Sequence, residues 1–433
     1  MLRFNAQAPQ GMAVQQLEVL VRTAIFKPAN ALVGYLLQMA AQRADASYQP
    51  RPGEHYKGQQ PLEVQGIFGS FQLYRAYYYH AGKKQGHYPA DAALGLEGGC
   101  TPALARLICL EGADESSYQK AEQHLLQTGG IPVSARQIQR VAQRVGRQAQ
   151  QWQEREATPG HCGAPILYAS ADGTGIPMRK DELRGRKGKQ EDGTAKTRQV
   201  YLGCVFTQHR RDEKGRPVRD YESTTYVSSM SSIEEFGPCL RQEALRRGMG
   251  KAQQVVLLID GAEGLERMGQ SCFRGCTQIV DFYHAMEHGG KVLAALLGDR
   301  NHPDFKGRLR HWAKRLIKNG VEKLITQARE ESAGKPQAQA VEKELGYFVH
   351  NIPRMQYGTF RQQGLFIGSG VVEAGCKTVI GARCKQSGMF WGEPGAENIL
   401  ALRCIHASRK LGEFWKDRLN TQAARNDALA LAA

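Results

Sequence analysis

The sequence predicts an α/β domain that contains a helical insertion and that follows a mixed helical and β-stranded (α+β) region at the N-terminus. Three observations lead to this prediction. Short, continuously apolar runs of strand length follow one another after residue 164, and two of them end in Asp-Gly. Helical patterns separate these runs and fill the interval 286–364, whereas an alternating pattern precedes them. Strands that are apolar throughout indicate a mixed sheet covered on both faces.

The composition favours a polyanionic partner. A chain of 433 residues has room for about three domains, and its net charge is +16. Such a charge attracts phosphate backbones, so nucleic acid is the first expectation and an anionic membrane the second; charge that serves solubility alone is the alternative. The start of the chain lacks the apolar core of a secretory signal, and no run of 18 apolar residues occurs. We therefore expect a cytoplasmic protein without a membrane partner.

The cysteines indicate reduced thiols. Ten of them are scattered along the chain and none forms a CxxC pair, so neither a disulfide framework nor a standard zinc site is expected. A metal site near Cys272 and Cys276 stays open as an alternative.

The N-terminal part combines helices with a hairpin. Residues 1–60 have helical spacing, and Pro28 predicts a break between two helices. Residues 61–150 begin with an alternating pattern that has Gly69 and Ser70 at the expected turn, which indicates a β-hairpin. The DNA-binding helices are expected after this hairpin.

A helix-turn-helix is expected at the end of that region. The helical stretch that begins at Tyr118 is followed by a glycine pair, and Ser134 with Gln137 forms a capping box that starts the next helix. One face of this second helix is apolar, and the rest of it carries the candidate DNA-binding residues Arg136, Arg140, Arg144 and Arg147. A surface helix with a solvated basic face is the alternative. Residues 148–163 are expected to form a linker.

Residues 164–285 and 365–410 form the expected catalytic domain. Its strands are expected at 166–171, 197–207 and 221–229 and then, after a helix, in VVLLID and TQIV. A Gly-Thr-Gly turn is expected directly after Asp172. The order β-β-β-α-β followed by α/β is the order of a ribonuclease-H-like fold.

Three carboxylates are the candidate catalytic and metal-binding residues. Asp172 and Asp260 each follow an apolar strand, where functional side chains of an α/β sheet gather, and Glu373 begins a helix after a glycine-rich turn. Converging carboxylates repel one another unless hard cations lie among them, which predicts two Mg²⁺ or Mn²⁺ ions and phosphoryl transfer on DNA. For either aspartate alone, a strand end or a helix cap is the alternative.

A helical insertion at 286–364 lengthens the interval between Asp260 and Glu373. It contains a basic segment around Trp312 that we expect to contact DNA; a buried helix anchor is the alternative for Trp312. Further candidate phosphate contacts after Glu373 are Lys377, Arg383 and Lys385. For Lys377, an ordinary surface pair with Glu373, four residues earlier, is the alternative. Residues 411–433 are expected to be a loosely helical or poorly ordered tail.

Four stretches, YASADGTGIPM, VVLLIDGAEG, IVDFYHAMEH and IGSGVVEAGCKTVIGARCKQSGMFW, resemble bacterial insertion-sequence transposases of the DDE class, in the Kra-type group. The resemblance spans most of the chain. It implies a ribonuclease-H-like domain whose catalytic acids match Asp172, Asp260 and Glu373, with a supporting DxxH element that matches Asp281 and His284. It also implies metal-dependent cleavage and strand transfer of the element's DNA ends, which the N-terminal region would bind.

The expected partners are double-stranded DNA, as element ends and as target, and further copies of the chain on that DNA. The expected location is the bacterial nucleoid in the cytoplasm. Two other functions stay open: a ribonuclease-H-like, structure-selective nuclease that cuts without joining, and a DNA-binding derivative that has lost catalysis. The complete set of three acids counts against the second.

Overall fold

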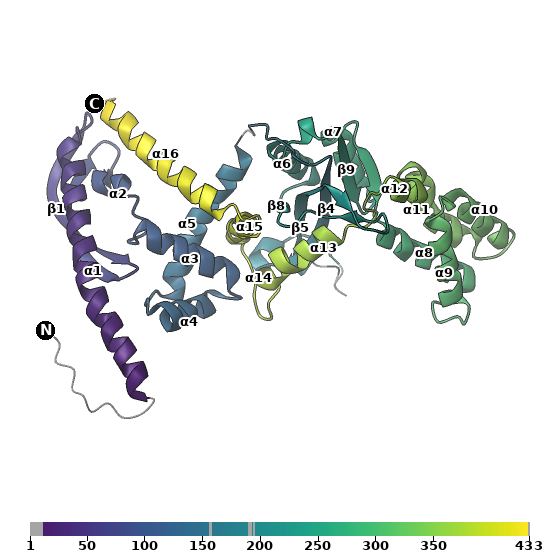
Figure 1. Cartoon of the computed structure of the whole chain (residues 1–433), viewed down its shortest axis with the longest axis horizontal. Helices are drawn as coiled ribbons and strands as arrows, with labels where there is room; N and C mark the ends of the chain where they lie inside the picture. Colours follow the sequence, from purple (N-terminus) through teal and green to yellow (C-terminus); the bar gives the residue numbers. More distant parts are fainter. Residues whose placement is uncertain (1–11, 156–157, 189–192, 194, 432–433) are drawn as a thin grey trace. The chain divides into compact units, whose positions relative to one another are not determined.

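The computed structural model describes residues 12–155, 158–188, 193 and 195–431. The chain divides into two compact units (Figure 1), which are Met1–Val145 with Leu411–Ala433, and Gly146–Lys410. Within the described residues, no helix combines the length and the apolar character needed to cross a bilayer.

One long helix opens the first unit. α1 (Met12–Ser47) passes through Pro28 without ending, so the expected division into two helices is wrong. Beyond the proline, the side-chain amide of Gln38 bonds both backbone groups of Tyr74 in β2 (Gly69–His80), each at 2.8 Å. Packing along this strand stabilises a continuous helix and offsets the backbone hydrogen bond that proline removes.

An antiparallel sheet lies beside α1. It consists of β1 (Glu54–Gly66), β2 and β3 (Gln85–His87), and the expected hairpin is present. Gly66 pairs with Gly69, so the two-residue turn precedes the expected position. The core of this part joins α1, the hairpin and α2 (Pro89–Ala93) through Ala41, Val64, Leu73 and Ala90.

Three helices follow the sheet: α3 (Pro102–Asp114), α4 (Tyr118–Gly129) and α5 (Ala135–Glu154). α4 ends at Gly130, which has a left-handed conformation that favours glycine (φ +62°). α5 extends into the expected linker 148–163, whose first part is therefore helical. The apolar stripe expected on α5 is buried at Ile138, Val141, Ala142 and Val145.

The C-terminal segment is helical, as one of the two expectations had it, and its first part packs in the first unit. α16 (Leu411–Leu431) contacts α2 and buries Phe414 and Trp415 near its start. Arg418 forms an ion pair with Glu97, and both side chains are 5% exposed. Aromatic burial and a desolvated ion pair fix this helix, and the composition of the segment alone does not reveal these partners.

A five-stranded mixed sheet forms the centre of the second unit. Its strands are β4 (Ile166–Pro177), β5 (Thr197–Gln208), β8 (Thr225–Ser229), β9 (Gln254–Ile259) and β10 (Thr277–Val280). They lie in the order β10-β9-β4-β5-β8, with β4, β9 and β10 parallel and β5 antiparallel to both of its neighbours. This arrangement is compatible with a ribonuclease-H-like fold. A separate small ladder joins β6 (Arg210–Arg211) and β7 (Pro217–Val218).

Helices cover both faces of this sheet (Figure 1). One face packs on α6 (Ile233–Arg246), which starts with a Ser232–Glu235 capping box, and on α7 (Glu263–Cys272). The other face packs on α13 (Gly370–Gly375), a π-helical turn (Cys376–Gly381) that leads into α14 (Ala382–Cys384), and α15 (Glu393–Ala407). Short 3-10 turns lie at Lys180–Leu183, Met249–Lys251 and Ile352–Arg354.

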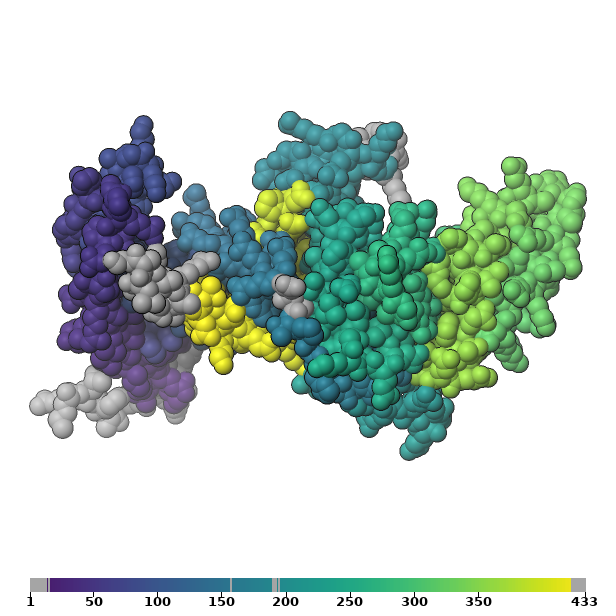
Figure 2. Space-filling model, turned by 90° about the horizontal axis from the view of Figure 1, so that it is seen from above, coloured from purple at the N-terminus to yellow at the C-terminus, as the bar shows by residue number. Residues whose placement is uncertain are grey.

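The insertion is a lobe of helices beside the sheet, coloured green in Figures 1 and 2. Its helices are α8 (Phe282–Leu297), α9 (Phe305–Leu316), α10 (Val321–Ser332), α11 (Ala338–Asn351) and α12 (Tyr357–Gln362). Trp312 of α9 is 4% exposed and packs edge-on against Phe348, with ring centroids 5.3 Å apart. Trp312 is therefore a buried anchor of the lobe, which is the alternative that the sequence left open for it, and not the expected DNA contact.

Candidate active site

The two aspartates leave neighbouring strands side by side. β4 and β9 pair in parallel up to Ser170 and Leu258, and Asp172 and Asp260 each follow two residues later. The expected Gly-Thr-Gly turn is wrong, because β4 continues along β5 as far as Pro177. Asp172 and Asp260 thus lie at the point where the pairing of β4 with β9 has ended and its pairing with β5 continues. Backbone N–H groups fix both carboxylates at 2.7 Å, from Gly173 to Asp172 and from Ala262 to Asp260.

Asp172 points to the sheet face that α13 covers. Ala169, Ala171, Leu257 and Ile259 belong to the core under α6 and α7. Since side chains alternate along a strand, Asp172 of β4 points to the opposite face, whereas Asp260 directly follows the last residue of β9. Burial raises the pKa of the Asp172 carboxyl, and the charge of Asp260 adds to that rise, whereas hydrogen bonds from Gly173 and Cys376 oppose it.

Glu373 reaches this face because α13 lies directly on the strands. A Cβ atom on Gly375 would lie 2.8 Å from Leu202 and 2.7 Å from Tyr226, so the close approach requires glycine. One residue later, the Cys376 thiol hydrogen-bonds the Asp172 carboxylate. Residues three apart share one side of a helix, so Glu373 lies on the side of α13 that meets Asp172.

Glu373 forms a compact group of possible metal ligands with Asp281 and His284, the two residues that were expected to support catalysis. Potential ligand atoms of Asp281, His284 and Glu373 all lie within 4.8 Å of one another. Among the described residues, Asp172 and Asp260 join no group of three at that separation. His284 is nevertheless close enough for its charge to act on Asp172. The five polar residues therefore form a pair and an adjoining triplet instead of one compact triad.

Asp281 joins the parts of the triplet. It is fully buried, and its carboxylate accepts the His284 N–H at 2.7 Å as the cap of α8. Its other oxygen accepts the backbone N–H of Ser369, whose hydroxyl donates to Glu373 at 2.9 Å. Ser369 thus links the start of α8 to α13. The sequence analysis missed Ser369 and Cys376, although each lies within four residues of Glu373, because no motif identifies their partners.

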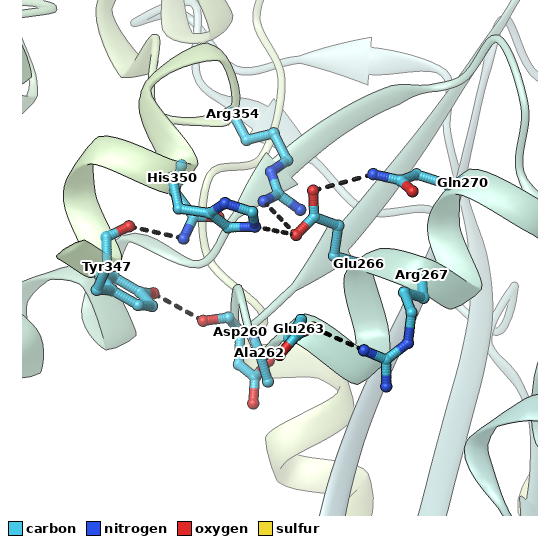
Figure 3. Close-up of polar contacts among 10 residues, drawn as sticks. Asp260, Ala262, Glu263, Glu266, Arg267, Gln270, Tyr347, His350 and Arg354 are labelled. Atoms are coloured by element: carbon cyan, nitrogen blue, oxygen red, sulfur yellow. Dashed lines mark hydrogen bonds and ion pairs between the residues drawn. The ribbon is translucent and has the colours of Figure 1, made fainter.

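The helical lobe contacts the backbone at Asp260 through α11 (Figure 3). The Tyr347 hydroxyl of α11 donates to the Asp260 carbonyl at 2.7 Å. Next to it, Glu266 of α7 accepts hydrogen bonds from Gln270 and His350 and forms an ion pair with Arg354 at 3.0 Å. The lobe therefore has a structural connection to the strand end that carries Asp260, which sequence spacing does not indicate.

The predicted DNA-contacting cations separate into exposed and buried side chains. The exposed ones are Arg136, Arg140, Arg144, Arg147, Lys377 and Lys385. Of these, Arg144 pairs with Glu97 at 3.1 Å, and Lys385 donates to the Thr174 hydroxyl. Arg383 is 1% exposed, with its guanidinium 5.1 Å from the centre of the Trp391 ring. Arg383 is thus part of the core, and its expected DNA contact is wrong.

A second group of possible metal ligands lies in the first unit. It comprises Glu111, Glu115 and His124, all partly exposed, with ligand atoms within 4.8 Å of one another. A hydrogen bond to Glu111 raises the pKa of His124. No cysteine belongs to either group, so among the described residues the zinc alternative near Cys272 and Cys276 gains no support.

Comparison with known proteins yields little. No family model matches the chain, and no curated protein matches it. Among solved structures, the chain is similar to the Drosophila P element transposase strand transfer complex over 73% of this chain and 80% of that chain, at 11% sequence identity and a TM-score of 0.22. A TM-score this low does not indicate a common fold.

Proposed function

We propose that this protein is a DNA transposase of the DDE class, which cleaves the ends of a DNA element and joins them to a target. Asp172, Asp260 and Glu373 are the proposed catalytic acids. The observation that carries the proposal is the convergence of two adjacent strand ends and α13 on one face of the sheet. The strand order of a ribonuclease-H-like sheet and the motif resemblance to Kra-type transposases support the same assignment.

The residues of the site fit a hard divalent cation. Asp172 is partly buried with a second carboxylate, Asp260, nearby, and two anions in that setting repel each other unless a cation neutralises them. Carboxylate oxygens are the ligands that Mg²⁺ and Mn²⁺ prefer. We assign Asp172, Asp260 and Glu373 as the residues that would hold two such ions. When bound, the ions activate an attacking oxygen and neutralise the leaving oxygen of a phosphodiester.

The remaining residues of the site position these acids. The Ser369 hydroxyl orients Glu373, Asp281 holds the Ser369 backbone, and Tyr347 holds the Asp260 backbone. In this proposal Asp281 and His284 are positioning residues, although their place beside Glu373 also allows them to contact a bound ion. Fixing acids through backbone contacts keeps them oriented while a polyanionic substrate enters.

Exposed cations suit such a substrate. In the second unit, Lys377 and Lys385 follow Glu373 on the same helical segment and are exposed. On α5, the exposed arginines are the proposed contacts for the element ends. Phosphate contacts of this kind give affinity without sequence information, so they are compatible with both end binding and target binding. Joining two ends would also require at least two copies of the chain on the DNA.

The test is a cleavage and joining assay. Purified protein is incubated with labelled DNA that carries the flanks of its coding sequence, with Mg²⁺ or Mn²⁺. Asp172→Asn, Asp260→Asn and Glu373→Gln should each lower the cleavage rate by about 10²-fold to 10³-fold or more, the scale for losing one transition-state contact, with DNA binding largely kept. Glu263→Gln is the matched control and should leave the cleavage rate unchanged. Glu263 lies three residues after Asp260, but its side chain is 79% exposed and pairs with Arg267.

The products decide between the candidate functions. Full cleavage by any one of the three variants would remove that residue from the site. Cleavage without joined products would favour a structure-selective nuclease. Binding with neither activity would favour the inactive DNA-binding derivative.

A further inference from the structure

A pocket of about 920 Å³ lies between the loop that follows β4 and the loop that follows α14. Its lining includes Met178, which is 1% exposed and forms a β-bridge with Trp391. Five cations and one aromatic ring surround it: Lys180, Arg184, Arg186, Lys187, Lys196 and Phe390. Among the described residues, none that lines this pocket is acidic. The pocket therefore suits an anionic ligand that also has an apolar face.

The aromatic ring is exposed on a fixed backbone. Phe390 is 57% exposed, whereas the next residue, Trp391, is 7% exposed. Backbone hydrogen bonds join Trp391 to Pro177 at 3.1 Å and to Arg179 at 2.9 Å. The Trp391 indole also donates to the Cys384 carbonyl at 3.2 Å. An aromatic side chain that is held in place but left unburied offers a flat surface on which a planar group can stack.

Among the described residues of the same segment, the two acids Asp181 and Glu182 are engaged elsewhere. Asp181 pairs with Arg179 at 3.0 Å, and Glu182 accepts the backbone N–H of Glu393 at 3.1 Å. Glu393 in turn forms an ion pair with Arg198. These carboxylates have partners outside the pocket, so they do not cancel the positive charge of its wall.

The strand that carries Asp172 leads to this pocket. Met178 lies six residues after Asp172, and β4 runs without a break to Pro177, so the pocket begins about 20 Å from the acid at about 3.3 Å per residue. Between them, the exposed Lys385 donates to the Thr174 hydroxyl. A strand of DNA that passes Asp172 and follows β4 would meet one cation on the way and five at the end. At the rise of about 3.4 Å per stacked nucleotide, the distance corresponds to at most about six nucleotides, and an extended single strand needs fewer.

We propose that this pocket binds an unpaired nucleotide of the DNA strand that reacts at Asp172, with the base stacked on Phe390 and the phosphates on the surrounding lysines and arginines. The identity of that strand rests on the proposed transposase function. The volume is within the range of pockets that enclose a small ligand, and a duplex does not fit in it. A surface for duplex phosphates needs only cations, whereas stacking of an unpaired base explains the exposed ring among them.

The test measures binding of fluorescent DNA hairpins in EDTA, which removes divalent ions and prevents cleavage. One hairpin is blunt, and a second carries a single-stranded thymidine tail of about six nucleotides, the span along β4. Wild-type protein should bind the tailed hairpin more tightly than the blunt one. Phe390→Ala should weaken binding of the tailed hairpin by about 5-fold to 100-fold, the range for one stacked base, and leave the blunt hairpin unchanged. Phe390→Trp should restore the preference.

Two further variants separate stacking from charge. Tyr221→Ala is the matched control, since Tyr221 is 85% exposed in the same unit but does not line this pocket, and it should not change the preference. Arg184→Ala with Lys196→Ala should weaken tailed-hairpin binding and reduce its salt dependence by about one unit of slope per lost contact. A fluorescent base analogue in the tail should change its emission with wild type and not with Phe390→Ala.

Three outcomes would overturn the inference: equal binding of both hairpins, an unchanged preference in Phe390→Ala, or equal loss of both DNAs in that variant, which would indicate a duplex-phosphate surface. These outcomes are independent of the proposed function. If wild-type protein cleaves and joins DNA but does not prefer the tailed hairpin, only the pocket assignment is refuted. A preserved tail preference without any cleavage refutes the transposase assignment alone.

Discussion

Among the described residues, one compact group of two carboxylates and one histidine lies in each unit, and the two groups differ in what holds them. The group in the first unit comprises Glu111, Glu115 and His124, whose side chains are 19%, 31% and 44% exposed. The group in the second unit comprises Asp281, His284 and Glu373. Asp281 is fully buried and accepts two backbone N–H groups, whereas in the first group His124 bonds the side chain of Glu111.

This difference shows that residue type and spacing do not define a site by themselves. Both groups have the composition of a metal site, and both bring their ligand atoms within 4.8 Å. In the second unit, backbone contacts and a sheet edge fix the acids before any ligand binds. On the surface of α3 and α4, each side chain can rotate away at little cost, because exposed pairs contribute little. Preorganisation therefore favours the second unit as the functional centre.

The largest expected effect concerns the stability that each group contributes. Asp281→Ala should lower the free energy of unfolding by about 3 kcal/mol, because a buried carboxylate that accepts two backbone N–H groups is lost and both donors stay buried. Glu111→Ala should lower it by about 1 kcal/mol or less, because Glu111 loses only a partly exposed pair with His124. Urea unfolding of both variants measures the contrast.

A second substitution at the same position sharpens this test. Asp281→Asn keeps one acceptor oxygen, so it should cost less than Asp281→Ala but more than Glu111→Ala. Equal stability of all three variants would mean that the backbone contacts of Asp281 contribute nothing, and the contrast between the two groups would disappear.

The sequence revealed the centre of the second unit because strong local signals coincide there. Apolar runs that end in Asp-Gly located β9 and the first half of β4, and the order of elements indicated the sheet. Parallel neighbours then bring Asp172 and Asp260 together whatever the exact strand bounds, since both follow the last paired residues by two positions. Gly173, Thr174 and Gly175 belong to a strand and not to the expected turn, but this difference does not change how Asp172 and Asp260 are brought together.

The sequence predictions were wrong where the environment of a side chain depends on a residue that is distant in the sequence. Trp312 and Arg383 belong to basic segments, and pattern alone suggests surface contacts. In the structure, Phe348 covers the first and Trp391 faces the second. Glu97 likewise fixes Arg418 of the C-terminal helix from more than 300 residues away in sequence. Such pairings depend on the three-dimensional fold, so neither helical periodicity nor local charge predicts them.

An intermediate effect is expected from divalent metal. Mn²⁺ at about ten times its dissociation constant should raise the free energy of unfolding by about 1.4 kcal/mol if it binds only the folded chain. Glu373→Gln should abolish this increase, whereas Glu111→Gln should leave it unchanged. Thermal unfolding with and without Mn²⁺ measures both. An increase that survives in Glu373→Gln and disappears in Glu111→Gln would place the metal in the first unit and reverse the comparison.

The smallest effect concerns pH and the surface group. A hydrogen bond to Glu111 raises the pKa of His124 above its ordinary value of 6.5. The folded state therefore holds the proton more tightly, so this contact stabilises the fold fully below pH 6.5 and loses its contribution as the pH rises through the raised pKa. Unfolding by urea at several pH values should show a small decrease across that window in wild type and a weaker one in Glu111→Gln. His209 contributes with the same sign through its bond to Asp220, so only the difference between the two proteins isolates His124. If the two curves are parallel, the contact contributes nothing to stability in solution, and the contrast with the anchored triplet of the second unit becomes larger.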